Sequence, residues 1–460
     1  MTYILLLLIF ICFNIISYKK FKDIFSPSFI FSIAMTLGIV CSIIGLLFWN
    51  NITNIKIITI IILMVSYLSF FLGELFVRWL LKKKNKSNTD KYKKWSKKDI
   101  PIWITILEII FAIITIILLY MEVKRIAQIA GYDNGSLGDM LSKFRSLSIL
   151  NSTYIIEQGL DVNILVSQMR KVCETFAFIN IFFLVKNIVN KKYKNINNIF
   201  YIFVIILTCI LSILMSERMQ IVIYIFAFGF MFIILSLKEM NLKEFAKKYF
   251  KKIISFLAIT IAVFCLMLPI VGRKIDKNLV SYFSYYFGIE IPSLDIYMDG
   301  PINPPEYFGQ ETLRGMSNVA YKLKIFDKIE PLSTQWLEFK TKDGNIYRSN
   351  IFTSAKRYYH DFGWLGIIIC QFIFSSTFTL IYLNIFKRKT PIVFVLYSSY
   401  IYMVADQIRD DLFYSNFIHI NVILRLCILM AFFIVYNIST KEISIKEVLS
   451  QWKKIGRRIQ

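Results

Sequence analysis

Long apolar runs alternate with short polar segments along almost the whole chain of 460 residues. Most runs are roughly 17–25 residues long, the length of an α-helix that crosses the hydrocarbon core of a bilayer. They are solidly apolar, unlike the short alternating strands of a membrane β-barrel. We therefore predict an all-α polytopic membrane protein with eleven transmembrane helices, at residues 2–17, 26–49, 57–77, 101–121, 165–185, 198–215, 220–237, 253–271, 363–385, 391–406 and 417–437.

Basic residues gather in every second connection between these runs. The loops 78–100 and 238–252 carry nine and six lysines, whereas the turn 216–219 carries Arg218 as its one basic residue. Because Lys and Arg are retained on the cytoplasmic side, this asymmetry predicts an N-terminus outside and a cytoplasmic tail at 438–460. The first run lacks a basic segment before it, so we expect no cleavable signal peptide.

The composition supports a membrane protein over a nucleic-acid-binding one. Hydrophobic residues make up 57% of the chain and charged residues 18%, against about 45–50% and 25% in soluble proteins. The net charge of +24 therefore reflects topology, and the basic clusters should contact anionic membrane lipids. We expect no nucleic-acid partner.

Two long connections, 122–164 and 272–362, are predicted to lie outside. The second holds five of the nine prolines and is rich in aromatic residues. Disordered linkers are poor in aromatics, so we predict an ordered extracytoplasmic cap at 272–362. Its aromatic side chains suit a glycan surface, or they form the core of the cap or an interfacial belt. The predicted domains are the helices of 1–271, this cap, the helices of 363–437 and the tail.

The chain shows no pattern typical of a metal site. All seven cysteines lie in apolar runs without metal-ligand spacing, which is typical of small packing residues. His360 and His419 are the only histidines, and two isolated histidines do not form a metal site. We predict neither a metal nor another cofactor.

Several arginines fall at the predicted outer ends of helices, where a charge needs a reason. A guanidinium group donates two parallel hydrogen bonds to phosphate oxygens, which suits a lipid-linked diphosphate. Each arginine could instead pair with a carboxylate or reach the headgroups. Arg170 shares a helix face with Glu174 four residues later, whereas nothing near Arg425 in sequence offers it a partner. The candidates for diphosphate binding are Arg170, Arg218, Arg273, Arg409 and Arg425.

One segment carries a family resemblance. Residues 350–366 read NIFTSAKRYYHDFGWLG. This resembles the Asn-x-x-Thr…Tyr-x-Asp-Phe-Gly-x-x-Gly segment of bacterial oligosaccharide repeat-unit polymerases, the Wzy-type O-antigen and capsule polymerases. Arg218 in its short outer turn looks like an arginine of that family, although Ser216-Glu217 replaces a Gly-Ser pair. The close match covers only about residues 345–366, whereas the predicted topology is similar over the whole chain.

The resemblance implies a glycosyltransferase of the bacterial plasma membrane that polymerises undecaprenyl-diphosphate-linked repeat units, with a flippase and a chain-length regulator as partners. An O-antigen-ligase-like enzyme is the nearest alternative, and a lipid-linked oligosaccharide flippase is an alternative of another class. Asp361, His360 and Asp406 are candidate bases, although Asp361 could equally be a helix N-cap. Gly363 and Gly366 should let another backbone approach. Candidates for glycan binding are Arg314, Arg348, Arg357, Tyr358 and Tyr359.

Overall fold

The computed structural model divides into two compact units. The first holds Met1–Lys93, Asp276–Lys389 and Tyr400–Val422, and the second holds Lys94–Ile275, Thr390–Ser399 and Ile423–Gln460. The structure describes residues 2–50, 54–84, 98–150, 162–237, 279–322, 336–342, 346–388 and 391–440, with a few isolated residues between these ranges.

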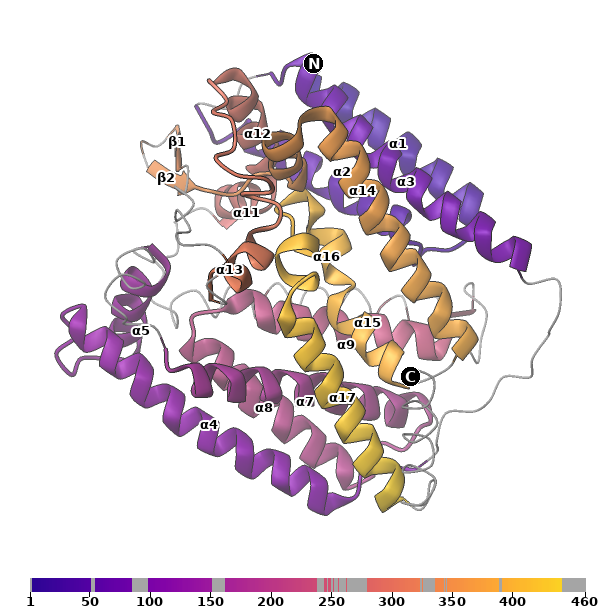
Figure 1. Cartoon of the computed structure of the whole chain (residues 1–460), viewed down its shortest axis with the longest axis vertical. Helices are drawn as coiled ribbons and strands as arrows, with labels where there is room; N and C mark the ends of the chain where they lie inside the picture. Colours follow the sequence, from indigo (N-terminus) through magenta and orange to yellow (C-terminus); the bar gives the residue numbers. More distant parts are fainter. Residues whose placement is uncertain are drawn as a thin grey trace. The chain divides into compact units, whose positions relative to one another are not determined.

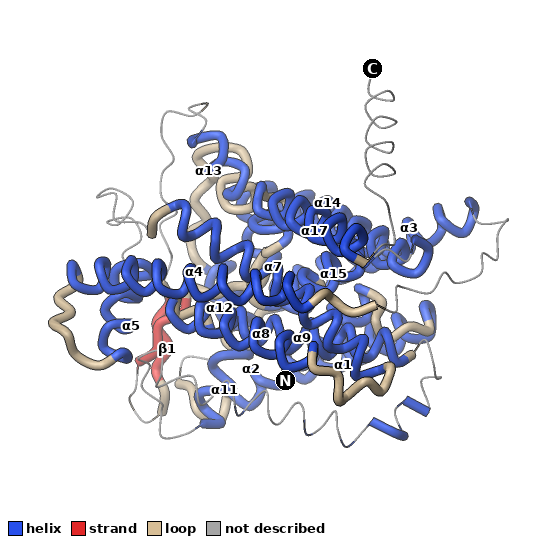
Figure 2. The backbone as a smooth tube through the Cα atoms, turned by 90° about the horizontal axis from the view of Figure 1, so that it is seen from below, coloured by secondary structure: helices blue, strands red, loops and turns tan. Residues whose placement is uncertain are grey.

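Ten of the described helices are long and apolar enough to cross a membrane. They match ten of the eleven predicted runs, so the prediction of an all-α, multi-pass membrane protein is confirmed. The remaining run, 253–271, lies outside the described residues apart from residues 255 and 262. Figure 2 shows the dominance of helices, with one β-hairpin in red.

Four transmembrane helices frame the first unit: α1 (Thr2–Phe21), α2 (Pro27–Gly45), α3 (Ile57–Lys84) and α14 (Ser354–Arg388) (Figure 1). Helices α3 and α14 approach closely at Gly73, where an added Cβ would lie 2.5 Å from the carbonyl oxygen of Phe372. Small residues permit such close packing inside a membrane. Gln371 of α14 adds a buried hydrogen bond of 2.9 Å to the Ser66 hydroxyl of α3.

The region predicted as a cap contributes short elements to the same unit. Trp49 is buried against Tyr285, Phe339 and Tyr347, with ring centroids 5.1–6.4 Å apart. These aromatics therefore pack as a core of their own, one of the alternatives that the composition left open. The elements are α11 (Leu279–Gly288), α12 (Glu290–Asp299), α13 (Arg314–Lys322) and the antiparallel hairpin β1 (Leu337–Lys340) and β2 (Ile346–Ser349); α16 (Tyr402–Ala405), η2 (Asp406–Ile408) and η3 (Phe413–Phe417) also belong to this unit.

Helix α14 begins at Ser354, earlier than the predicted start at residue 363. The family-like segment is therefore largely helical, and a kink at Gly363 separates it from the long apolar part. Gly363 has φ +62° and ψ −148°, a conformation that is essentially restricted to glycine. Gly366 has a different role, because an added Cβ would lie 2.3 Å from the carbonyl oxygen of Tyr358. The predicted approach of another backbone is therefore not seen at either glycine, because the backbone near Gly366 is that of α14 itself and an added Cβ at Gly363 would meet nothing within 4 Å.

The second unit is a helical bundle with an apolar core. Leu119 and Val123 of α4 are buried with Cys173 of α7 and Leu211 of α8. Cys173 is a free thiol inside this core, as predicted for a packing residue. The helices of this unit are α4 (Ile102–Ile129), α5 (Leu137–Arg145), η1 (Ser146–Leu150), α7 (Ile164–Val189), α8 (Asn197–Leu214), α9 (Arg218–Ser236), α15 (Pro391–Tyr400) and most of α17 (Ile420–Ser439).

Candidate functional site

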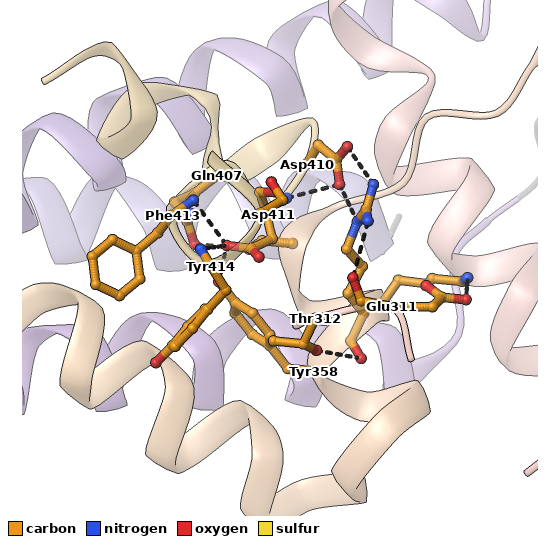
Figure 3. A network of polar contacts seen from close by, with 12 residues as sticks. Glu311, Thr312, Tyr358, Gln407, Asp410, Asp411, Phe413 and Tyr414 are labelled. Atoms are coloured by element: carbon orange, nitrogen blue, oxygen red, sulfur yellow. Dashed lines mark hydrogen bonds and ion pairs between the residues drawn. The ribbon is translucent and has the colours of Figure 1, made fainter. Parts of the chain in front are cut away.

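The first turns of α14 collect a dense group of polar side chains in the first unit (Figure 3). We name this group the α14 cluster. Its partners come from the loop before α13 and from the loop between η2 and η3, so three distant stretches of sequence meet here. The members of the α14 cluster are Glu311, Lys356, Arg357, His360, Asp361, Asp410 and Asp411.

All three guanidinium nitrogens of Arg357 donate hydrogen bonds within the cluster. Its Nε and Nη2 donate to the two carboxylate oxygens of Asp410 at 2.5 and 2.7 Å, a two-pronged pair. Its Nη1 donates to the backbone carbonyl of Glu311 at 3.2 Å. Lys356 pairs with the Glu311 carboxylate, and its ammonium group lies 4.9 Å from the centre of the Tyr297 ring. Arg357, predicted to bind glycan, therefore ties two loops to α14.

His360 lies between two polar groups. The Tyr297 hydroxyl is 2.9 Å from Nδ1, within hydrogen-bond distance. Nε2 is 3.8 Å from the carboxylate of Glu311, beyond a hydrogen bond but close enough for electrostatic attraction. When Nδ1–H donates to Tyr297, Nε2 carries the lone pair and can accept a proton. The nearby carboxylate would then stabilise the imidazolium that forms.

The Asp361 carboxylate holds a loop. It accepts the backbone N–H of Thr312 at 2.6 Å and that of Glu311 at 3.1 and 3.2 Å. The alternative of Asp361 as the N-cap of the following helix is wrong, because these hydrogen bonds go to residues about fifty positions earlier. Asp361 thus fixes the loop that supplies Glu311 to His360.

Asp411 anchors the loop before η3. Its Oδ1 accepts the Tyr358 hydroxyl at 2.7 Å and the Phe413 backbone N–H at 3.1 Å. Its Oδ2 is buried and has no hydrogen-bond partner among the described residues. Burial raises the pKa of Asp411 to about 6. Tyr358, predicted to bind glycan, is fully buried and serves this anchor.

Asp406 and Arg409 belong to a neighbouring charged group that includes Glu290. Arg409 Nη1 is 3.6 Å from Asp406, and Nε is 3.5 Å from Glu290. Glu290 is completely buried, and neither carboxylate oxygen accepts a hydrogen bond within the described part of the chain. Burial raises its pKa to about 8. The sequence analysis missed Glu290, although a carboxylate between Ile289 and Ile291 is a signal that could have pointed to it.

In the second unit the predicted arginines form an alternating chain of charges. Arg170 is 3.2 Å from Glu174 and 2.5 Å from Glu217. Arg425 lies 3.3 Å from the other oxygen of Glu174, so the partner that its neighbouring sequence does not offer comes from a distant helix. The sequence could not reveal this pair because its members are 251 positions apart. The i to i+4 pairing of Arg170 with Glu174 is as predicted.

Arg218 begins α9 directly after a tight turn. The turn uses Ser216 with φ +56°, an uncommon conformation for a residue with a side chain. Arg218 is only 3% exposed, so its guanidinium group is largely removed from bulk water. The predicted position at a helix start after a short hairpin is confirmed, and its phosphate-binding role stays a prediction. Arg273 lies outside the described residues.

The other predicted glycan-binding residues differ in their surroundings. Arg348 is exposed and pairs with Glu338 across the hairpin at 3.0 Å. Tyr359 packs edge-on against Trp364. Arg314 is half-buried at the start of α13 and makes no hydrogen bond or ion pair with any residue that the structure describes. Burial and the neighbouring Arg357 guanidinium lower the pKa of Arg314.

Comparisons with known proteins identify no relative of this chain. No protein-family profile matches the chain, and neither the curated proteins nor the solved structures give a match. Within the described ranges, no group of three or more His, Cys, Asp and Glu side chains could hold a metal ion.

Proposed function

We propose that this protein is a membrane glycosyltransferase. It transfers a growing glycan from undecaprenyl diphosphate to a new lipid-linked repeat unit at the outer face of the bacterial plasma membrane, and so builds an O-antigen, capsule or related polysaccharide. The observation that carries the proposal is the position of the polymerase-like segment. Residues 354–361 supply the core of the α14 cluster, and that cluster contains a histidine with an adjacent carboxylate.

His360 is the best candidate for the general base. The acceptor hydroxyl must lose a proton as its oxygen attacks the anomeric carbon and the bond to the diphosphate breaks. His360 has a ring nitrogen facing Glu311 without a hydrogen bond to it, whereas Asp361 is engaged by backbone N–H groups and Asp406 by Arg409. The base is therefore His360 in this proposal, with Glu311 and Tyr297 as positioning residues.

The departing diphosphate requires fixed positive charge. Arg218 is our first candidate, because it follows a short turn like the arginine of the polymerase family and is largely buried as the first residue of α9. Arg170, Arg273, Arg409 and Arg425 remain secondary candidates. A flippase and a chain-length regulator are the proposed partners.

Glycan length in a gene-deletion strain tests the proposal. Loss of a polymerase should leave single repeat units in place of long chains, and wild-type protein supplied from a plasmid should restore them. Purified protein in proteoliposomes should likewise extend lipid-linked repeat units extracted from the deletion strain. Normal chain length without the protein would reject the proposal.

The same strain separates the alternatives. Loss of an O-antigen-ligase-like enzyme would leave long chains attached to undecaprenyl diphosphate. Loss of a flippase would leave single repeat units at the cytoplasmic face, where an impermeant glycosidase added to spheroplasts could not reach them. A polymerase defect leaves those single units accessible from outside.

A further inference from the structure

The loop 306–314 carries an uncommon combination of side chains beside the α14 cluster. Phe308 is 79% exposed and packs against Phe362 with ring centroids 4.8 Å apart. Arg314 follows at the start of α13 and is half-buried. Tyr307 lies near Arg314 and Asp361, because both charges act on its hydroxyl. An apolar ring face and a cation therefore occur within one short loop.

This loop is held in place and does not depend on Arg314 for its shape. The Asp361 carboxylate accepts the N–H groups of Glu311 and Thr312. Gly315 lies against η3, where an added Cβ would be 2.6 Å from the carbonyl oxygen of Ser415. These contacts fix the backbone on both sides of Arg314, so its side chain is presented by a supported loop.

The charge of Arg314 stands out from the other cations nearby. Lys356 is paired with Glu311, and Arg357 is paired with Asp410. Arg314 forms no ion pair or hydrogen bond with a carboxylate among the described residues, although the Glu311 and Asp410 carboxylates act on its charge from farther away and it is partly removed from water. A half-buried guanidinium group without a partner favours an anionic ligand that brings oxygen acceptors to it.

We propose that Phe308 and Arg314 form a subsite for an acidic sugar residue, in which the ring of the sugar packs on Phe308 and its carboxylate binds Arg314. This inference rests on the proposed glycan-transferring function and names its substrate class as an acidic glycan. The exposed aromatic face favours a sugar carboxylate over a bare phosphate, because a phosphate gains nothing from an aromatic ring.

Direct binding to the full chain in lipid nanodiscs tests the subsite without relying on catalysis. The probes are glucuronate, galacturonate and N-acetylneuraminate, with neutral glucose and galactose for comparison and with inorganic pyrophosphate as a separate arm. Calorimetric titration should show that at least one acidic sugar binds and that the neutral sugars bind more weakly. Arg314→Gln should weaken that binding by about ten- to a hundredfold, the usual effect of losing a charged hydrogen-bond pair.

Two variants control for charge and folding. Lys56→Gln removes an exposed cation of the same unit that already pairs with Asp299, and it should leave acidic-sugar binding unchanged. Phe308→Ala should weaken acidic and neutral sugars alike, since it removes the ring face only. Because Arg314 makes no contact that the described fold requires, Arg314→Gln should unfold at the wild-type temperature.

The outcomes are distinct from those for the proposed function. Arg314-dependent binding of pyrophosphate but not of acidic sugars would overturn the subsite in favour of a phosphate site. Equal binding by wild type and Arg314→Gln, or no binding of any acidic sugar, would also overturn it. Acidic-sugar binding with normal glycan length in the deletion strain would keep the subsite and reject polymerisation. Polymerisation without acidic-sugar binding would keep the proposed function and reject the subsite.

Discussion

The buried charges of the second unit and those of the α14 cluster are compensated by different kinds of partner. In the second unit, Arg425, Glu174, Arg170 and Glu217 alternate in sign along one chain of contacts. Each cation there has a carboxylate beside it. In the α14 cluster the carboxylates also accept backbone N–H groups and hold loops. Arg314, beside the cluster, has no carboxylate in contact among the described residues.

This difference indicates whether the charged side chains of each region stabilise packing or are available to bind a ligand. Alternating ion pairs between helices stabilise packing. They are poor binding sites for a ligand, because separating a buried ion pair is strongly destabilising. The α14 cluster combines fixed loops with a histidine, and Arg314 beside it forms no ion pair with a described residue. We therefore expect substitutions in the chain of Arg425, Glu174, Arg170 and Glu217 to act mainly on stability and those in or beside the α14 cluster to act mainly on activity.

The largest effect should come from His360→Ala. Removing a general base typically slows a reaction by about 10²–10⁴-fold. Chain extension in proteoliposomes should fall by that factor, with the melting temperature close to wild type. His419→Ala is the matched control, since it removes the other histidine of the chain, and it should extend chains normally. Equal activity of both variants would exclude His360 as the base.

Glu174→Gln should be the most damaging substitution in the second unit. It leaves two mostly buried arginines without the carboxylate that they share, and breaking a buried pair typically costs about 3–5 kcal/mol. Thermal unfolding in detergent should show a clear loss of stability. Glu338→Gln, which breaks the exposed pair with Arg348, should cost no more than about 1 kcal/mol. Similar losses in the two variants would contradict the proposed difference between buried and exposed pairs.

Asp361→Asn separates a loop anchor from a base. The amide can no longer offer two charged oxygens to the N–H groups of Glu311 and Thr312, and a hydrogen bond to a charged group contributes about 1.5–3 kcal/mol. Hydrogen exchange at residues 311 and 312 should become faster, and activity should fall through the displaced loop. Unchanged exchange together with a complete loss of chain extension would instead return Asp361 to the role of base.

The smallest effect concerns pH. Burial raises the pKa of Asp411 to about 6 from its ordinary value of 3.8, so the folded state holds this proton more tightly than the unfolded state. Its contribution to stability is therefore full below pH 3.8 and is lost as the pH rises through about 6. Asp411→Asn keeps the oxygen that accepts the Tyr358 hydroxyl. Its neutral NH2 group takes the place of Oδ2, which has no hydrogen-bond partner in the described structure.

Melting temperatures measured between pH 4 and pH 7 check this expectation. The profile of Asp411→Asn should be flatter than that of the wild type across the window, and the variant should be at least as stable at pH 7. A steeper profile in the variant would show that Asp411 is held charged in the folded protein.

The sequence predicted the helices far better than the α14 cluster. Spans such as 57–77 and 101–121 follow from local hydrophobicity, and Arg170 with Glu174 follows from helical spacing. The pair of Arg357 and Asp410 joins residues 53 positions apart. Nothing local encodes such a contact, since it depends on where the fold places the loop between η2 and η3 against α14. The β1–β2 hairpin was missed for a similar reason, as its short strands carry no long alternating pattern.

The kink in α14 makes Gly363 a case where contact-based estimates of mutational tolerance fail. A Cβ at this position would meet no atom within 4 Å, so a scan that scores collisions would permit alanine. The conflict lies inside the residue itself, because φ +62° with ψ −148° suits L-amino acids poorly. No compensating change elsewhere removes such a conflict. A residue of the opposite chirality avoids this conflict. The mirror image of this conformation lies near polyproline II, so D-alanine introduced by chemical ligation should fit at Gly363 where L-alanine does not.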